Sequence, residues 1–265
     1  MTERIDDIGF GGLKLIQDPE EFCYGVDAVI LADFAATRLS KKAKRASESL
    51  KQGCIVDLGT GSGIIPLILS AKTEANRIVG VELQQASYCR AKRNAALNGL
   101  EERLSFINAD VKNISASKKS ELPEAAEAQA FEALLGRVTA VTANPPYMPS
   151  CGGLTNSNSA KAIARHETTA GLWDFFAAAA ALLKPKGDLF MVHRPSRLAD
   201  ICCFARENGL EPKELRFVSP GVRKAANIVL IHCVKNGGKD LRLSEPLFIY
   251  EEDGSYTDEL RQCYL

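Results

Sequence analysis

Short apolar runs alternate with longer, helix-like stretches along the chain after residue 50. The runs are rich in β-branched residues, as buried strands of parallel sheets are. They cover Cys54–Leu58, Arg77–Leu83, Leu104–Asn108, Val138–Ala143, Asp188–His193 and Asn227–Val234. The stretches between them have helical character and cover Ile64–Ala75, Gln84–Asn98, Leu172–Leu183 and Arg197–Asn208. This order predicts a parallel sheet with helices on both faces.

Two Asn-Gly pairs mark where helices are expected to end. Asn98-Gly99 and Asn208-Gly209 each close a helix-like stretch, and glycine after the last helical turn readily takes the left-handed conformation that ends a helix. We therefore expect a strand to begin soon after each pair.

Residues 1–50 precede the alternating pattern and are expected to form a short N-terminal module, followed by one domain over residues 51–265. Within the module, Asp27–Arg38 carries apolar residues at helical spacing, which predicts a helix. Lys112–Gly136 is rich in alanine and glutamate. We interpret it as an insert that holds one helix, with a mobile start around Ser115–Ser120.

No apolar run approaches the roughly 18 residues that a membrane-spanning helix needs. The longest, Phe175–Leu183, has nine residues and is mostly alanine. The amino terminus, Met1–Gly9, has three acidic residues, one arginine and no apolar centre, which is not the composition of a secretory signal. We expect a cytoplasmic protein without a membrane span.

Cysteine and charge content narrow the possible functions further. The eight cysteines include no C-x-x-C pair and the chain has only three histidines, so we expect reduced cysteines and no metal site. The 33 basic and 33 acidic residues balance, which argues against a protein that coats nucleic acid indiscriminately. Local basic residues remain candidates for contact with a specific RNA, namely Lys41, Lys42, Lys44, Arg45, Arg194, Arg197, Arg223 and Lys224.

A glycine-rich loop lies where a predicted strand passes into a predicted helix. It runs from Val56 to Gly63 with the sequence Val-Asp-Leu-Gly-Thr-Gly-Ser-Gly. Glycines allow a tight turn and the close approach of a ligand, and the amino end of a helix favours a carboxylate or phosphate. Dinucleotide enzymes use such loops too, so the loop predicts a cofactor without naming it. Its candidate cofactor-binding residues are Gly59, Thr60, Gly61 and Gly63.

Three details, the glycine spacing, Asp57 and Asp110, favour S-adenosylmethionine over a dinucleotide, whereas Glu82 fits either cofactor. The glycine spacing is G-x-G-x-G, and Asp57, two residues before Gly59, would repel a pyrophosphate but attract the ammonium group of S-adenosylmethionine. Glu82, nineteen residues after Gly63, ends the next strand, where it can bind ribose hydroxyls. Asp110 follows the strand after that and can accept from the adenine amino group. The alternatives are a plain turn for Asp57 and helix caps for Glu82 and Asp110.

With this loop and these acids, residues 50–235 resemble the class I, Rossmann-like methyltransferases. The resemblance implies an α/β fold with a seven-stranded, mostly parallel sheet whose last strand is antiparallel, and with helices on both faces. It also implies S-adenosylmethionine as the cofactor.

Asn144-Pro145-Pro146-Tyr147 stands at the end of the fourth predicted strand, at the edge where open α/β sheets bind ligands. The two prolines fix the backbone and leave the Pro145 carbonyl free to accept a hydrogen bond. Together with the side-chain carbonyl of Asn144, it can hold an amino group without a titrating base. Tyr147 offers a flat face for a planar acceptor. The motif looks like that of amino methyltransferases that act on adenine N6, guanine N2 or glutamine amides; a plain turn is the alternative.

Phe22–Ala32 looks like the opening motif of the bacterial tRNA-valine adenine N6-methyltransferase family, with Gly25 and Asp27 carrying the match. The likeness extends to Ala164–Glu167 and to Asn227 in the late strand. It implies that Tyr24, Gly25 and Asp27 contribute to cofactor binding. Gly25 would let the backbone close over the cofactor, and Asp27 would contact the ligand or cap the following helix.

These observations predict an S-adenosylmethionine-dependent N-methyltransferase that acts first of all on adenine N6 in tRNA, without a metal. Transfer would be direct and would depend on the alignment of the amino nitrogen by Asn144 and Pro145. The alternatives are a protein glutamine N5-methyltransferase, an rRNA guanine N2-methyltransferase and, outside the enzymes, an RNA-binding adaptor that keeps the fold.

Overall fold

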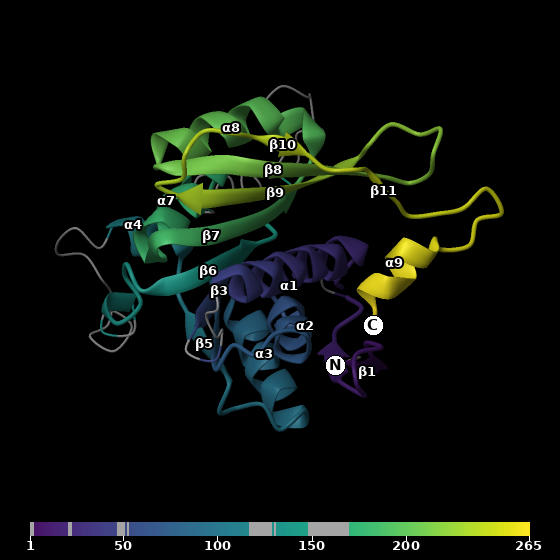
Figure 1. The fold of residues 1–265 in the computed structure, drawn as a ribbon. Helices are drawn as coiled ribbons and strands as arrows, with labels where there is room; N and C mark the ends of the chain where they lie inside the picture. Colours follow the sequence, from purple (N-terminus) through teal and green to yellow (C-terminus); the bar gives the residue numbers. More distant parts are fainter. Residues whose placement is uncertain are drawn as a thin grey trace, which may run out of the picture.

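The fold is seen in a computed structural model, which describes residues 3–20, 23–46, 51, 53–116, 129, 131–147 and 170–265. Within these residues, nine strands form one main sheet (Figure 1). From one edge to the other they are β10 (Arg242–Leu243), β8 (Leu210–Ser219), β9 (Ile228–Lys235), β7 (Leu183–His193), β6 (Val138–Ala143), β3 (Cys54–Leu58), β4 (Arg77–Glu82) and β5 (Leu104–Asn108), with β11 (Leu247–Phe248) also paired with β8.

The strands run parallel from β5 to β7 and β8 shares their direction, whereas β9 is antiparallel to both of its neighbours. Strands β3 to β9 therefore form the seven-stranded sheet with an antiparallel last strand that the resemblance implied. The expected strand count was too low, because β10 and β11 pair with β8 near the sheet edge. Each has only two residues, which is too short to give a periodic sequence pattern.

The observed strands follow the apolar runs closely. Strands β3, β5 and β6 coincide with predicted runs, and β8 begins at Leu210, directly after Gly209. Strand β7 begins at Leu183 rather than at Asp188, because Leu183 pairs with Val138 ahead of an irregularity in the ladder. The three residues after Leu183 are exposed, so they lack the apolar pattern of a buried strand.

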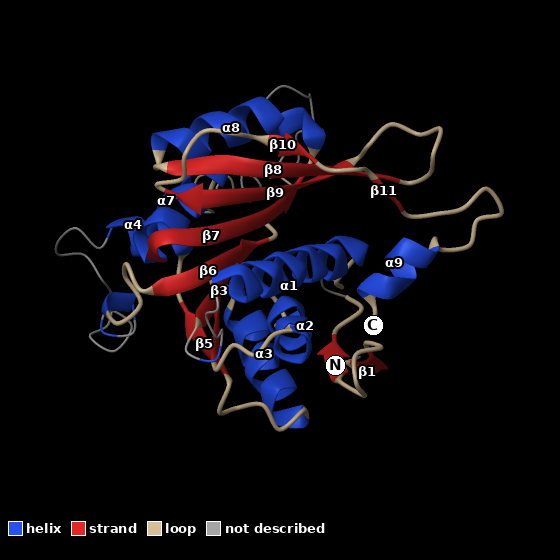
Figure 2. Cartoon of the chain, viewed as in Figure 1, coloured by secondary structure: helices blue, strands red, loops and turns tan. Residues whose placement is uncertain are grey.

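Helices cover both faces of the sheet, as predicted, and Figure 2 shows them against the strands. One face carries α1 (Val26–Ala46), α2 (Ile64–Lys72) and α3 (Gln85–Leu97), and the other carries α4 (Val111–Ala116), α7 (Leu172–Leu182) and α8 (Leu198–Glu207), with a short 3₁₀ helix, η2 (Pro195–Arg197), before α8. Each face of the sheet has its own hydrophobic core: the first lies under α1, α2 and α3, and the second under α4, α7 and α8. Alternate strand residues point into the two cores, so that Ile55 of β3 belongs to the first and Val56 to the second. None of the described helices is long and apolar enough to cross a membrane.

Helix α1 is longer than the predicted helix, which ended at Arg38. It continues to Ala46 through polar residues that break the apolar pattern. Lys42 donates hydrogen bonds to Asp188 and to the Lys186 carbonyl, both at 2.6 Å. The end of α1 is therefore stabilised by polar contacts with β7 rather than by buried apolar residues. A search for apolar periodicity cannot predict such contacts.

The N-terminal module contains a hairpin that the sequence did not predict. Its strands β1 (Arg4–Asp7) and β2 (Lys14–Gln17) pair antiparallel, and β2 lies against α3. Helix α9 (Asp258–Cys263) brings the other end of the chain close to the hairpin (Figure 1). Tyr264 stacks on Phe10 with ring centroids 6.0 Å apart, so the two ends of the chain share a small aromatic contact.

Both ends of the predicted insert pack into the second core. Ile114, Phe131 and Leu134 are at most 2% exposed. Residues 117–128 and 130 lie outside the described residues, so the single helix with a mobile start stays a prediction. Ala164–Glu167, which extended the family likeness, also lies outside them.

Candidate active site

The glycine loop and the Asn144–Tyr147 motif leave neighbouring strands at the same edge of the sheet. After β3 the chain builds β4 and β5 on one side and then returns to form β6 on the other side of β3. Leu58 of β3 pairs with Ala143 of β6, so Gly59 and Asn144, the next residues, emerge side by side. Such a reversal of strand order opens a crevice in which α/β proteins bind ligands. The structure thus brings the two predicted halves of the site together.

Main-chain hydrogen bonds fix the shape of the glycine loop. The Gly59 and Thr60 amides donate to the Val81 carbonyl at 2.9 and 3.0 Å, and the Gly63 amide donates to the Thr60 carbonyl at 3.0 Å. Gly59, Gly61 and Gly63 have φ angles of 71°, 56° and 86°, which favour glycine. A Cβ atom at Gly61 would meet nothing within 4 Å. The loop is therefore a preformed turn with open space beside its middle residue.

Asp57, just ahead of the loop, has no exposed surface. Its two carboxylate oxygens accept hydrogen bonds from the hydroxyls of Thr60 and Thr142, each at 2.7 Å. Burial raises the pKa of Asp57 to about 7, although these two hydrogen bonds oppose the shift. The carboxyl group therefore connects the loop to β6. Its contact with a ligand ammonium group stays a prediction.

Glu82 connects the loop to the start of α3. One carboxylate oxygen accepts from the Gly61 amide and the other from the Gln84 amide, both at 2.8 Å. Gln84 precedes the first residue of α3 and that helix has no side-chain cap, so the helix cap that the sequence left open as an alternative for Glu82 is not seen. The contact with Gly61 was not predicted, and it places the carboxylate against the middle of the loop. The ribose role of Glu82 stays a prediction.

Asp110 follows β5, at the same sheet edge, and caps α4. Its Oδ1 accepts from the Lys112 amide at 2.9 Å, and its carbonyl accepts from the Asn113 amide at 3.0 Å. The capping alternative therefore holds for Asp110. Its predicted contact with adenine is untested.

The Asn144–Tyr147 motif is tied to the N-terminal module by a side-chain contact. The Tyr147 hydroxyl donates to Asp27 Oδ2 at 3.0 Å, and burial raises the pKa of the Tyr147 phenol above its ordinary value. The Arg194 guanidinium stands 4.6 Å from the Tyr147 ring centroid, and the His193 ring packs edge-on at 5.3 Å. Arg194 thus covers one face of Tyr147. Along the motif, Asn144 is half-buried, Pro145 buried, Pro146 exposed and Tyr147 half-buried.

Asp27 and Gly25 act as a pair at the start of α1. Asp27 lies in the first turn of α1, where its Oδ1 accepts from the Ala28 amide at 3.0 Å and its Oδ2 accepts from the Tyr147 hydroxyl. A Cβ atom at Gly25 would lie only 2.8 Å from Asp27 Oδ1. Glycine at position 25 therefore makes room for the Asp27 carboxylate, a reason that the sequence did not reveal.

Tyr24 lies in a different place from the loop residues. It lines an open cavity of about 610 Å³ between the N-terminal hairpin and the C-terminal segment, together with Tyr256 and Tyr264. The lining of this cavity does not include the glycine loop. The cofactor role that the family likeness implied for Tyr24 stays a prediction.

Sequence reasoning missed Thr142 and His193. Thr142 is in register with Asp57 on the adjacent strand, and a polar residue inside an apolar run was the available signal. His193 ends β7, beside β6, where polar residues point to a ligand edge. Its Nδ1 accepts from the Arg194 amide at 2.8 Å, and burial lowers the pKa of His193, so the neutral ring is favoured.

In the described parts of the chain, no group of three or more histidine, cysteine, aspartate or glutamate side chains is arranged to hold a metal ion. The carboxylates of Asp57, Glu82 and Asp110 instead meet backbone amides and hydroxyls.

Comparison with known proteins points to methyltransferases. Residues 35–122, which include the glycine loop, match a family model described as ribosomal protein L11 methyltransferase (PrmA). The fold resembles that of an Agrobacterium tumefaciens protein described as a predicted O-methyltransferase, with a TM-score of 0.63 and 19% identity over 89% of this chain and 94% of that one. The fold is thus that of the Rossmann-like methyltransferases, as expected.

Sequence relatives are similar over more of the chain. A tRNA1(Val) (adenine(37)-N6)-methyltransferase of Aeromonas hydrophila is 26% identical over 241 residues, which are 90% of this chain and 86% of that protein. A protein of the same name from Porphyromonas gingivalis is 28% identical over 183 residues, 68% of this chain and 62% of that protein. These similarities confirm the resemblance that Phe22–Ala32 and Asn144–Tyr147 indicated.

Proposed function

We propose that this methyltransferase transfers a methyl group from S-adenosylmethionine to N6 of an adenine in tRNA. The observation that carries the proposal is the position of the Asn144–Tyr147 motif beside the glycine loop, at the point where the strand order reverses. The names of the Aeromonas hydrophila and Porphyromonas gingivalis relatives support tRNA adenine as the substrate. With such a substrate, the cytoplasm is the compartment in which we expect the enzyme to work.

The residues around the loop fit S-adenosylmethionine. The open space at Gly61 is a cradle that a side chain would fill. A carboxylate oxygen can accept more than one hydrogen bond, so Glu82 and Asp110 keep acceptor capacity for ribose hydroxyls and for the adenine amino group. The bound cofactor supplies a methyl group that its positively charged sulfur activates for transfer.

The acceptor half orients the amino nitrogen. The Asn144 side-chain oxygen and the Pro145 carbonyl each accept one hydrogen of the adenine amino group, which turns the nitrogen lone pair toward the methyl group. Their carbonyl dipoles also stabilise the positive charge that develops on the nitrogen. After transfer, one proton leaves to water. Alignment at close range supplies most of the rate enhancement, without a titrating base.

Tyr147 provides the surface for the base. An adenine rotated out of its stack gains stacking energy on an aromatic ring. Because the Arg194 guanidinium covers one ring face, the base takes the opposite face or displaces the guanidinium. Arg194 also donates to the Asn227 carbonyl at 3.0 Å, so a local partner remains for a displaced guanidinium.

Transfer of a labelled methyl group tests the proposal. The protein is incubated with methyl-labelled S-adenosylmethionine and an unmodified bacterial tRNA transcript, with duplex RNA as control. We expect label in the tRNA and less in the duplex, because anticodon-loop bases are already partly unpaired. RNA binding should weaken with salt, with a log-log slope of about −0.7 per contacted phosphate. Label that is found in protein but not in RNA, or the absence of label from RNA altogether, would overturn the assignment of tRNA as the substrate.

A further inference from the structure

The N-terminal hairpin is attached to α3 through two side-chain amides. The amides of Lys14 and Ile16 in β2 donate to the side-chain oxygens of Asn98 and Asn94, at 2.8 and 2.6 Å. The side-chain nitrogens of Asn98 and Asn94 donate back to the same two residues' carbonyls, at 2.8 and 3.2 Å. Asn94 and Asn98 are four residues apart on a helix, which is about 6 Å, and Ile16 and Lys14 are two residues apart on a strand, which is about 6.6 Å. The spacing of the two asparagines therefore matches the spacing of the two β2 residues that they bind.

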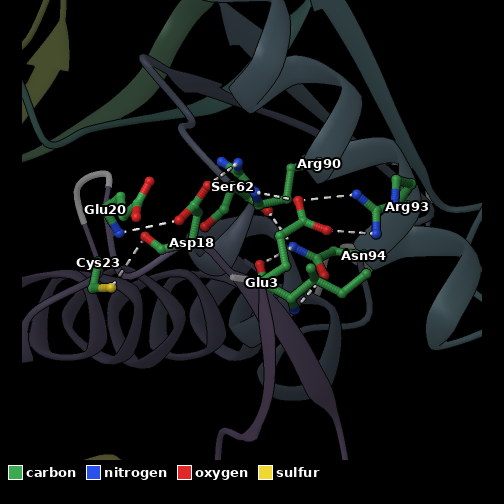
Figure 3. A network of polar contacts seen from close by, with 9 residues as sticks. Glu3, Asp18, Glu20, Cys23, Ser62, Arg90, Arg93 and Asn94 are labelled. Carbon is green, nitrogen blue, oxygen red and sulfur yellow. Dashed lines mark hydrogen bonds and ion pairs between the residues drawn. The ribbon is translucent and has the colours of Figure 1, made fainter. Parts of the chain in front are cut away.

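Each asparagine makes one further contact, and this contact distinguishes them. Asn98 donates to the Asn94 carbonyl of its own helix at 2.7 Å. Asn94 donates instead to the Ser62 carbonyl of the glycine loop at 2.9 Å. Figure 3 shows Asn94 beside Ser62 and the N-terminal segment. Asn94 has no exposed surface, so the hairpin, α3 and the loop meet at one buried amide.

Ser62 is a loop residue whose carbonyl direction its own neighbours do not fix. Ser62 lies between Gly61 and Gly63, whose φ angles are 56° and 86°. Peptides next to glycine have wide conformational freedom. Asn94 fixes the direction of the Ser62 carbonyl, and therefore the orientation of the peptide that enters α2. A Cβ atom on Gly63 would lie 3.3 Å from Ala91, so the same face of α3 also packs against the loop.

Ion pairs hold the hairpin on α3 independently of Asn94. Glu3, just before β1, bonds to Arg90 at 3.2 Å and to Arg93 at 2.8 Å (Figure 3). Asp18, just after β2, lies 3.8 Å from Arg90. The hairpin therefore stays docked when a single amide is removed, which makes the loop contact of Asn94 separable by mutation.

We propose that Asn94 is a positioning residue for the cofactor loop, which couples docking of the N-terminal hairpin to binding of the cofactor. The inference rests on the proposed function, in that the loop holds S-adenosylmethionine. Cofactor binding stabilises the loop conformation that Asn94 supports, and by reciprocity it stabilises the hairpin that Asn94 also holds. Asn98, with the same hairpin contacts and no loop contact, takes no part in the coupling.

Asn94→Ala and Asn98→Ala form the matched pair for the test, with S-adenosylhomocysteine as the probe. We expect Asn94→Ala to weaken its binding by about tenfold in calorimetry, the size of one buried hydrogen bond. Asn98→Ala should stay within about twofold of wild type. In hydrogen exchange, the probe should slow exchange over residues 3–17 in wild type and in Asn98→Ala, but not in Asn94→Ala.

The outcomes separate the coupling from the proposed function. Equal effects of the two variants on affinity, or ligand-dependent protection of the hairpin that persists in Asn94→Ala, would overturn the coupling alone. A wild-type protein that does not bind S-adenosylhomocysteine would overturn the cofactor assignment and the coupling with it. If Asn94→Ala does not fold, Asn94→Asp keeps the acceptor for the Ile16 amide and loses the donor to Ser62, with Asn98→Asp as its match.

Discussion

The glycine loop after β3 is held by its own main chain, by strand β4 and by Asn94 of α3, whereas the Asn144–Tyr147 motif after β6 contacts the N-terminal module directly, through Tyr147 and Asp27. The loop amides bind Val81 and Glu82, which both come from the adjacent strand β4. Tyr147 binds Asp27, which is 120 residues away in sequence. The N-terminal module therefore reaches the cofactor half indirectly, through Asn94, and the acceptor half directly, through the hydrogen bond between Tyr147 and Asp27. Substitutions in the two halves should separate cofactor affinity from turnover.

Asn144→Ala should give the largest effect, a loss of turnover without a loss of cofactor affinity. Loss of an acceptor placed for the developing charge should lower turnover by roughly two to three orders of magnitude, about 3–4 kcal/mol. Cofactor affinity should remain near that of wild type, because no loop contact changes. Single-turnover kinetics and calorimetry measure the two quantities. Wild-type turnover in this variant would show that Asn144 does not hold the acceptor.

Glu82→Ala should have the converse effect on the cofactor half. Loss of a charged acceptor for ribose hydroxyls, and of the Gly61 contact, should weaken cofactor binding by roughly 1.5–3 kcal/mol. Turnover at saturating cofactor should change less. Glu82→Gln, which keeps the size and one acceptor, serves as the control. Unaltered affinity in calorimetry would leave Glu82 with a structural role alone, through its contacts with the Gly61 and Gln84 amides.

Asp57→Asn should change how stability depends on pH, because burial raises the pKa of the Asp57 carboxyl group in the folded protein. The pKa of Asp57 is about 7 in the folded protein and ordinarily 3.8, so between these values the folded state holds a proton that the unfolded state has lost. Wild-type stability therefore falls as pH rises through this window. Relative to wild type, the variant should gain about 1.4 kcal/mol between roughly pH 6 and 8. Urea unfolding of both proteins at about pH 6 and about pH 8 measures this difference in the free energy of unfolding. A difference that is the same at both pH values would mean that Asp57 is ionised in the folded protein throughout this range.

Tyr147→Phe should produce the smallest effect and again affect only the acceptor half. The ring remains for stacking, but the hydrogen bond to Asp27 is lost. A neutral donor of this kind contributes about 1 kcal/mol, so turnover should fall roughly fivefold. Cofactor affinity should not change. An equal loss of cofactor affinity would show that the N-terminal module acts on the loop through Tyr147 as well as through Asn94.

Local sequence pattern predicted the parts of the fold that rest on local burial. The bounds of β3, β5 and β6 follow directly from apolar runs. The polar end of α1 was missed because Lys42 is held by contacts with β7, and the hairpin was missed because β1 and β2 have only four residues each.

In the site, the sequence predicted which residues gather at the sheet edge but not their contacts. The acids Asp57, Glu82 and Asp110 lie in or just after the carboxyl ends of the neighbouring strands β3, β4 and β5, so topology alone brings them to one edge. The contact of Asn94 with Ile16 joins residues 78 positions apart. Such a pairing depends on how α3 docks against the hairpin, which no spacing within either segment determines.

The identity of the methylated nucleoside tests the proposed reaction most directly. An unmodified tRNA transcript is incubated with wild-type protein or Asn144→Ala and S-adenosylmethionine, digested to nucleosides and analysed by mass spectrometry. We predict N6-methyladenosine with wild type and, with the variant, a yield lower by roughly two to three orders of magnitude in the same time. N2-methylguanosine alone, or methylglutamine in an added protein with unmethylated RNA, would contradict the adenine assignment.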